Sequence, residues 1–220
     1  MKQSLFFRAT ASNYVPSVPS LYDVWDLGIA NSLIWRCPTK FLRQHFRTHV
    51  TLNHLDVGVG SGYFLDKCLL EQKRRLALID TDNTTLEAAA TRIERFKPEV
   101  YQADVLSPLN LPCKKFDSIS INYLFHNLSG AIKEKAILMD HLKEYLHDGG
   151  TIFGSTILSH GVCHSFAAQK LMAFYNQNGR FSNTRDYRNG LREELESRFT
   201  NVKIEVKGSV ALFSARNGER

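Results

Sequence analysis

From residue 52 onward, short apolar runs alternate with longer stretches in which apolar residues recur at helical spacing. The stretches between the runs predict helices of about 12–18 residues. Strands that alternate with helices in this way are typical of a parallel sheet that helices cover on both faces. The apolar runs predict the strands, at TLNHLDVG (51–58), RLALID (75–80), VYQADV (100–105), FDSISINYLF (116–125) and TIFGSTIL (151–158).

The helical stretches carry their own start and stop signals. Asn83 or Thr84 can cap the helix after the second strand. Gly149 and Gly150 can stop the amphipathic helix that precedes the fifth strand. Helices are expected over 61–72, 83–96, 131–150 and 186–199.

Two further strands close the chain. NVKIEVKG (201–208) and SVALFSAR (209–216) are joined only by Lys207 and Gly208. So short a link requires the two strands to be antiparallel neighbours. The expected fold is therefore α/β: a doubly wound, Rossmann-like, seven-stranded sheet that is mostly parallel, with an antiparallel last strand.

Two segments lie outside this alternation. Residues 1–50 are rich in aromatic residues and are expected to be helical from about 20 to 47. Residues 158–185 lie between the fifth strand and the last helix. Ligands of doubly wound sheets bind at the carboxyl ends of the strands, so both segments are candidate lids over one domain at 51–220.

The composition supports a single globular domain. The chain has 220 residues, 43% of them hydrophobic, enough to bury one full core. The formal charge of +6 leaves nucleic acid open as a partner, but the basic residues are scattered, which indicates a solvated surface. The four cysteines form no CxxC or CxxH pair, so we expect neither a metal site nor disulfides. We expect a cytoplasmic protein without a membrane span; its oligomeric state, including a homodimer, stays open.

The turn after the first strand carries the main chemical signal. A dinucleotide-binding G-x-G-x-x-G turn would need glycine at position 63, which is Tyr63. An acid before the turn is unfavourable beside a pyrophosphate but suits a ligand with an ammonium group, which favours S-adenosylmethionine and disfavours a dehydrogenase. The pattern present is D-x-G-x-G-x-G, formed by Asp56, Gly58, Gly60 and Gly62.

With this turn and four further motifs in order, the chain resembles the class I S-adenosylmethionine-dependent methyltransferases over roughly residues 50–215. The motifs that carry the resemblance are LDVGVGSGYFL, LALIDTD, YQADVL, FDSISINYLFHNL and LHDGGTIFGSTIL. The resemblance implies a class I fold and S-adenosylmethionine as the cofactor.

The resemblance also implies roles for individual residues. Asp80, with Thr81 beside it, is expected to accept hydrogen bonds from the ribose hydroxyls, although Asp80 can instead cap a helix and Asp82 competes for the ribose role. Asp104 is expected to meet the adenine amino group and Val105 the ring edge.

The acceptor side is expected beyond the fourth strand. Asn122 and Tyr123 lie toward the end of that strand and are expected near the cofactor. His126 is the first candidate for a general base because its ordinary pKa suits that work near neutral pH, with local packing as the alternative. His160, in the second candidate lid, is the next candidate base.

Aromatic residues also recur at helical spacing in the second candidate lid. Phe166, Phe174 and Tyr175 can line an apolar acceptor pocket or pack within the lid.

Two residues of the N-terminal segment are candidate cofactor contacts. Tyr22 can close over the methionine end of the cofactor or pack within the lid. Arg36 can pair with the cofactor carboxylate or form a surface ion pair.

The sequence thus predicts an enzyme that transfers a methyl group to an oxygen, nitrogen or carbon of a small molecule. NYLF at 122–125 lacks the prolines of the N/D-P-P-Y/F/W signature that nucleic-acid amino-methyltransferases of this fold carry. Within the family, the chain looks most similar to the methyltransferases that act on small metabolites, including those of natural-product pathways. An RNA methyltransferase and a non-catalytic S-adenosylmethionine-binding regulatory protein are the alternatives.

Overall fold

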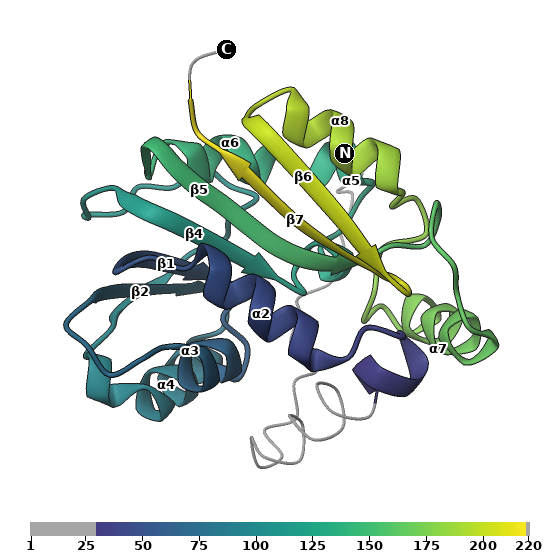
Figure 1. Ribbon diagram of the computed structural model, residues 1–220, viewed down its shortest axis with the longest axis horizontal. Coiled ribbons are helices and arrows are strands. Elements are labelled where there is room, and N and C mark those ends of the chain that lie inside the picture. The colour runs from purple at the N-terminus through teal and green to yellow at the C-terminus, as the bar shows by residue number, and fades with distance from the viewer. Residues whose placement is uncertain (1–29, 219–220) are drawn as a thin grey trace, which may run out of the picture.

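A computed structural model describes residues 30–218 and contains one seven-stranded sheet in the order β3-β2-β1-β4-β5-β7-β6 (Figure 1). Strands β1 to β5 pair in parallel, and β7 lies antiparallel between β5 and β6. The strands are β1 (Asn53–Val57), β2 (Arg75–Asp80), β3 (Glu99–Gln102), β4 (Phe116–Asn122), β5 (Leu146–Ile157), β6 (Thr200–Lys207) and β7 (Val210–Arg216).

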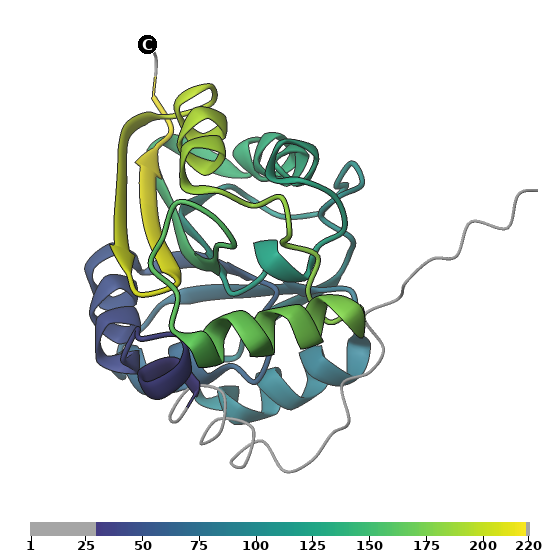
Figure 2. The ribbon, with the colours of Figure 1, turned by 90° about the vertical axis from the view of Figure 1, so that its right-hand side faces the viewer.

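Helices cover both faces of the sheet (Figure 1). Helices α2, α3 and α4 lie on one face, and α5, α6 and α8 lie on the other. Helix α7 lies beyond the carboxyl ends of the central strands (Figure 2). The helices are α2 (Thr39–His49), α3 (Tyr63–Cys68), α4 (Asn83–Arg92), α5 (Ile132–Lys135), α6 (Ile137–Lys143), α7 (Phe166–Gln177) and α8 (Arg188–Glu196), with 3-10 turns η2 (Glu94–Phe96) and η3 (Phe125–Asn127).

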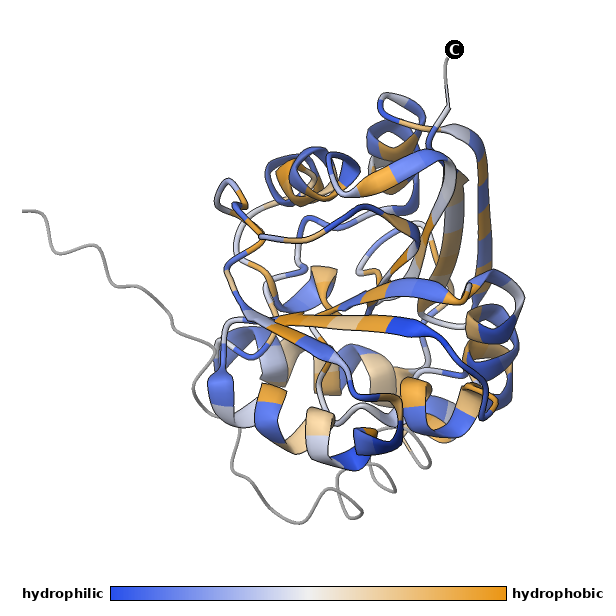
Figure 3. Cartoon of the chain, turned by 90° about the vertical axis from the view of Figure 1, so that its left-hand side faces the viewer, coloured by the Kyte–Doolittle hydropathy of each residue, from blue (hydrophilic) through white to orange (hydrophobic). Residues whose placement is uncertain are grey.

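The central strands are buried on both faces, as a parallel sheet requires. Apolar residues concentrate along them, while the helices show polar residues on their outer sides (Figure 3). Each of the following strand residues is at most 2% exposed: Leu55, Val57, Leu76, Leu78, Ile119, Ile121 and Ile152. The expected doubly wound sheet and the antiparallel last pair are confirmed.

The expected helix over 131–150 is wrong in its second half. Helix α6 ends at Lys143, and β5 already begins at Leu146. The Gly149 N–H donates to the Asn217 carbonyl, and the Asn217 N–H donates to the Gly150 carbonyl. These hydrogen bonds to the end of the chain take the place of helical ones. The two glycines therefore lie in an irregular part of β5.

The described part of the expected N-terminal helix is also interrupted. Residues 30–34 form one π-helical turn, and α2 begins only after Pro38. Leu42 and Phe46 of α2 are buried, and the Phe46 ring packs edge-on against Phe153 of β5. Helix α2 is therefore part of the layer that covers the sheet, while residues 20–29 lie outside the described residues.

Candidate active site

The turn after β1 brings backbone close to the place where a ligand would lie. Gly58, Gly60 and Gly62 have backbone φ angles of 67°, 53° and 70°, which residues other than glycine rarely adopt. A Cβ on Gly58 would lie 2.9 Å from Leu124, so the turn packs tightly behind. A Cβ on Gly60 would have nothing within 4 Å, so this glycine faces open space that a cofactor can fill.

Neighbouring elements hold the turn in place. The Gly58 N–H donates to the Ile79 carbonyl of β2 at 2.8 Å. Arg92 of α4 donates to the Ser61 carbonyl at 3.1 Å and to Asp66 of α3 at 3.2 Å. The turn is therefore fixed before a ligand arrives.

Two acids follow one another at the end of β2, and the structure gives them different roles. Asp82 is the N-cap of α4 and accepts from the Thr84 and Thr85 N–H groups at 3.1 and 3.3 Å. Asp80 accepts from the Asp82 N–H at 3.1 Å, and its partly buried carboxylate remains at the sheet edge. The cap is therefore Asp82 and not Asn83 or Thr84, as the sequence had suggested, and this supports Asp80 as the ribose ligand. Thr81, beside it, is exposed.

The turn after β3 lies next to the end of β2, because the Ala103 N–H donates to the Asp80 carbonyl at 3.0 Å. Asp104 is exposed and accepts from the Leu106 N–H at 3.0 Å. Val105 is buried, and its carbonyl accepts from His141 at 2.9 Å. The two residues expected at the adenine thus lie beside the acid expected at the ribose.

Asp56 is buried at the end of β1, where the Ser120 hydroxyl donates to it. Burial raises the pKa of Asp56 to about 7; the Ser120 hydrogen bond opposes this shift and the Asp80 carboxylate adds to it. A cation beside Asp56 would favour its ionised form. This environment suits a ligand that carries an ammonium group.

Asn122 and Tyr123 end β4 at the same edge. The Asn122 amide oxygen accepts from the Ser155 hydroxyl at 3.1 Å, while its Nδ2 is buried without a hydrogen-bond partner among the described residues. A buried donor without a partner is costly, and a ligand oxygen would remove that cost. Tyr123 has φ of 53°, rare for a bulky residue, and its hydroxyl donates to Asn31 at 2.8 Å.

His126 lies in the next turn and is buried. Its Nδ1 accepts from the Ile157 N–H at 3.3 Å, so the imidazole proton resides on Nε2. Burial, with the nearby Lys135 ammonium, lowers the pKa of His126 to about 3. His126 is therefore a neutral, weakly basic side chain, and its role as general base stays a prediction.

An aromatic wall surrounds His126. The Phe181 ring lies 4.5 Å from the His126 ring and 4.9 Å from that of Tyr175, and the Tyr123 ring lies 5.6 Å from His126 (centroid distances). The sequence did not single out Phe181, because it lies in a polar loop after α7. Phe166, which its helical spacing made a candidate for the acceptor pocket, is 75% exposed instead.

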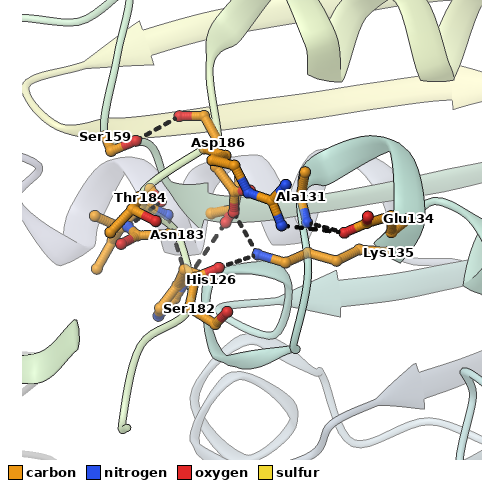
Figure 4. Close-up of polar contacts among 12 residues, drawn as sticks. His126, Ala131, Glu134, Lys135, Ser159, Ser182, Asn183, Thr184 and Asp186 are labelled. Carbon is orange, nitrogen blue, oxygen red and sulfur yellow. Dashed lines mark hydrogen bonds and ion pairs between the residues drawn. The ribbon is translucent and has the colours of Figure 1, made fainter. Parts of the chain in front are cut away.

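A buried ion pair fixes the loop that carries Phe181 (Figure 4). The Lys135 ammonium donates to the Asp186 carboxylate at 2.7 Å and to the Ser182 carbonyl at 2.6 Å, and both charged side chains are fully buried. The Ser182 N–H donates to the His126 carbonyl at 2.8 Å. Burial lowers the pKa of Lys135 and raises that of Asp186, while their hydrogen bond opposes both shifts.

The remaining candidates lie at the margin of this edge or outside the described residues. His160 is exposed, and its Nε2 lies 3.1 Å from the Thr184 carbonyl. Arg36 is exposed beside the β6–β7 turn, where the Ser209 N–H donates to the Trp35 carbonyl at 2.8 Å. Tyr22 lies outside the described residues. The roles of all three stay predictions.

Residues 30–218 contain no group of three or more His, Cys, Asp or Glu placed to hold a metal ion. Within the same residues, no helix is long and apolar enough to cross a membrane. All four cysteines lie in this part of the chain and are unpaired.

The sheet order, the glycine turn after β1 and the acid at the end of β2 together define an S-adenosylmethionine-binding protein of the methyltransferase type. The residues fit this cofactor, because Gly60 faces open space and Asp56 and Asp80 offer acceptors along one edge. A family profile described as "Methyltransferase domain" matches residues 55–152.

The chain belongs to this methyltransferase family. It is 42% identical over 192 residues to the uncharacterized protein YbcY of Escherichia coli K12, covering 86% of this chain and 98% of that one. It is 37% identical over 204 residues to the physcion biosynthesis cluster O-methyltransferase of Aspergillus chevalieri, covering 92% of each.

A solved structure confirms the fold. N-methyltransferase NodS from Bradyrhizobium japonicum WM9, in complex with S-adenosylhomocysteine, superposes with a TM-score of 0.60 at 19% identity, covering 82% of this chain and 85% of that one. The protein is an S-adenosylmethionine-dependent methyltransferase with the class I fold, as the sequence predicted.

Proposed function

We propose that the enzyme methylates a small, partly apolar molecule of natural-product metabolism, with oxygen as the first acceptor atom to test. The observation that carries this proposal is the aromatic wall of Tyr123, His126 and Phe181 at the carboxyl end of β4. Aromatic walls with few polar groups are typical of small-molecule sites. The O-methyltransferase of the physcion biosynthesis cluster supports this class of acceptor.

The cofactor is assigned to the ends of β1, β2 and β3. Bound S-adenosylmethionine supplies a methyl group that an aligned nucleophile takes from sulfur. Asp56 would hold its ammonium group, the backbone at Gly60 would allow its close approach, and Asp80 would accept from its ribose. At the end of β3, Asp104 and Val105 would hold the adenine, with Thr81 at the mouth of the site.

On the acceptor side, Asn122 and His126 orient the acceptor. The unpartnered Asn122 Nδ2 donates to an acceptor or cofactor oxygen. The neutral His126 packs against the acceptor through its ring, and it takes a proton only as a weak base. Residues 30–38, which include Arg36, and residues 158–185, which include His160, would cover this site, while Tyr22 lies outside the described residues.

A nucleic-acid acceptor has less support. A basic hollow of about 300 Å³ lies on the outer face of α2, not beside the aromatic wall. The residues that line it are Lys40, Arg43, Gln44, Arg47 and Thr48.

A cytoplasmic location is also proposed. It is supported by the unpaired Cys37 and Cys68, which are buried as thiols and whose pKa values burial raises to about 12 and about 11.

The test is methyl transfer from radiolabelled S-adenosylmethionine to a panel of phenols, amines and active-methylene compounds, with total RNA as a parallel acceptor. Label in a small phenolic product supports the proposal. Label in RNA alone overturns it in favour of the nucleic-acid reading. Tight cofactor binding without transfer to any acceptor favours the regulatory protein. Size-exclusion chromatography with light scattering measures whether the enzyme is a homodimer.

A further inference from the structure

A chain of hydrogen bonds runs between β1 and β4 beneath the cofactor turn. The strand register places His54 opposite Ser118 and Asp56 opposite Ser120. The His54 Nδ1 lies 2.8 Å from the Ser118 hydroxyl, and its Nε2 lies 3.0 Å from the Ser120 hydroxyl. Ser120 in turn donates to Asp56. At the other end, the Thr51 N–H donates to the Ser118 hydroxyl oxygen at 3.0 Å.

The direction of each hydrogen bond follows from its neighbours when Asp56 is ionised. Ser120 gives its only proton to Asp56, so its oxygen accepts from His54 and the imidazole proton lies on Nε2. Nδ1 then accepts from the Ser118 hydroxyl, whose oxygen accepts the Thr51 N–H. Every donor in the chain therefore points toward Asp56.

We propose that His54 is a positioning residue for the cofactor: through Ser120 it holds the Asp56 carboxylate ionised and oriented toward the cofactor's ammonium group, and its tautomer follows the charge of Asp56. This inference rests on the proposed placement of that ammonium group beside Asp56. Hydrogen bonds aligned in one direction reinforce each other in a low-dielectric interior.

Protonation of Asp56 reverses the hydrogen bonds from Asp56 to Ser118, while the Thr51 N–H still donates to Ser118. The Ser120 proton passes to Asp56, the His54 Nε2 proton passes to Ser120, and the Ser118 proton passes to Nδ1. The Thr51 hydroxyl, which donates to the Asn53 carbonyl at 3.0 Å and lies 2.8 Å from the Ser118 hydroxyl, turns to give its proton to Ser118 and takes one from water. The net result is the uptake of one proton, taken from water at Thr51 and appearing on Asp56. His54 stays neutral, with its proton moved from Nε2 to Nδ1.

The surroundings allow this exchange without charging His54. Burial lowers the pKa of His54 to about 3, and Arg74 nearby adds to the shift. Phe46 of α2 and Phe153 of β5 pack against the His54 ring. Two further titratable rings of α2, His45 and His49, lie beyond Phe153.

Asp56 has a different environment. Asp80 of β2 is the charged group that faces it, and burial with this neighbour raises the pKa of Asp56 to about 7. Asp56 therefore changes charge near neutral pH, where His54 remains neutral.

The measurement is nitrogen-15 NMR of histidine-labelled full-length protein, which distinguishes neutral Nε2–H from neutral Nδ1–H imidazoles. The chain has 8 histidines, so loss of a signal in His54→Gln assigns the residue, and its displacement in Ser118→Ala gives a second assignment. In the ligand-free protein, we expect the Nε2–H form to convert to Nδ1–H as the pH falls through about 7.

Bound S-adenosylhomocysteine, which keeps the ammonium group, is expected to move this conversion down by at least about one pH unit, because a nearby cation favours the carboxylate. An Nε2–H signal that persists from about pH 8 to about pH 5.5 in the ligand-free protein would overturn the proposal.

Ser120→Ala cuts the chain with a minimal change in volume. We expect the His54 tautomer to become insensitive to pH and to S-adenosylhomocysteine, and the affinity for this ligand to fall about tenfold, since Asp56 loses a hydrogen bond to its ionised form. Ser214→Ala, at another buried serine of the sheet on β7, is the matched control and is expected to retain the wild-type response. A wild-type tautomer response in Ser120→Ala would contradict the proposal.

Calorimetry separates this inference from the proposed site. Unchanged S-adenosylhomocysteine affinity in Asp80→Ala would overturn the cofactor placement. The ligand-free pH titration would still decide whether His54 follows Asp56.

Discussion

The carboxyl edge of the sheet has two halves that are built in different ways. The cofactor half consists of the turns at 56–62, 80–82 and 104–105, each a few residues long and placed directly by the strand before it. The acceptor half consists of residues 122–126, 156–157 and 181–186, which hold one another through contacts between distant parts of the chain. Local turns therefore define the proposed cofactor site, whereas tertiary packing defines the proposed acceptor wall.

The buried ion pair gives the sharpest test of this difference. Lys135→Met is expected to destabilise the protein by about 3–5 kcal/mol, because it leaves the Asp186 carboxylate buried without its partner. Urea denaturation measures this change. The double variant Lys135→Met, Asp186→Leu is expected to recover much of the loss. The control Arg192→Met breaks the exposed pair with Glu196 and should change stability by less than about 1 kcal/mol. Equal effects of the two single variants would contradict the distinction.

In the cofactor half, Asp80→Ala is expected to weaken S-adenosylmethionine binding while leaving the fold intact. Loss of hydrogen bonds to a charged acceptor predicts a reduction of about tenfold or more by calorimetry. Asp82→Ala is the matched control, because that carboxylate caps α4. If Asp82→Ala weakened binding more than Asp80→Ala, the assignment of the two acids would be reversed.

The pH dependence of stability tests whether His126 is buried as a neutral ring in the proposed acceptor half. Its pKa is about 3 in the folded protein and about 6.5 when unfolded, so the unfolded chain binds more protons between these values. Its contribution to stability is present above about pH 6.5 and is lost as the pH falls toward 3. Between about pH 7 and pH 5 the loss is about 2 kcal/mol. In His126→Gln, the stability measured by urea denaturation should therefore fall less over this range. An unchanged pH dependence would show that His126 is not buried as a neutral ring.

The smallest expected effect comes from the helix cap. Asp82→Ala is expected to lower the free energy of unfolding by about 1 kcal/mol, the usual contribution of an N-cap side chain. Thermal denaturation measures this loss. Asn83→Ala, one position later in the first turn of α4, should have a smaller effect. A larger loss in Asn83→Ala would move the cap to that residue.

The turns of the proposed cofactor half could be predicted from the sequence because their signals are local, while the binding roles of their residues stay predictions. An acid, three alternating glycines and a following apolar helix suffice to place the turn at 56–62. The choice between Asp80 and Asp82 could not be made from residue types, since either acid can cap a helix. The hydrogen bonds that the Asp82 carboxylate accepts from the Thr84 and Thr85 N–H groups assign the cap to Asp82.

The acceptor half was much less predictable. Tyr123 meets Asn31 across 92 positions, and Lys135 meets Asp186 across 51. No periodicity within a short window reports such pairs. Helical spacing drew attention to Phe166, which faces solvent, while Phe181 lies in a loop with no repeating pattern. The prediction of a helix up to Gly150 was wrong for a similar reason. Gly149 and Gly150 pair with Asn217, which lies far away in the sequence.

The Lys135–Asp186 pair also limits how this enzyme can be re-engineered. A designer who wants a new acceptor range would naturally exchange the segment between β5 and α8 as one cassette. The partner of Asp186, however, lies outside that cassette, on α5. A grafted segment without an acid at this position would leave the Lys135 ammonium buried without its carboxylate partner. Successful chimeras must therefore transplant α5 together with the segment, or replace both charges by apolar residues in the same step.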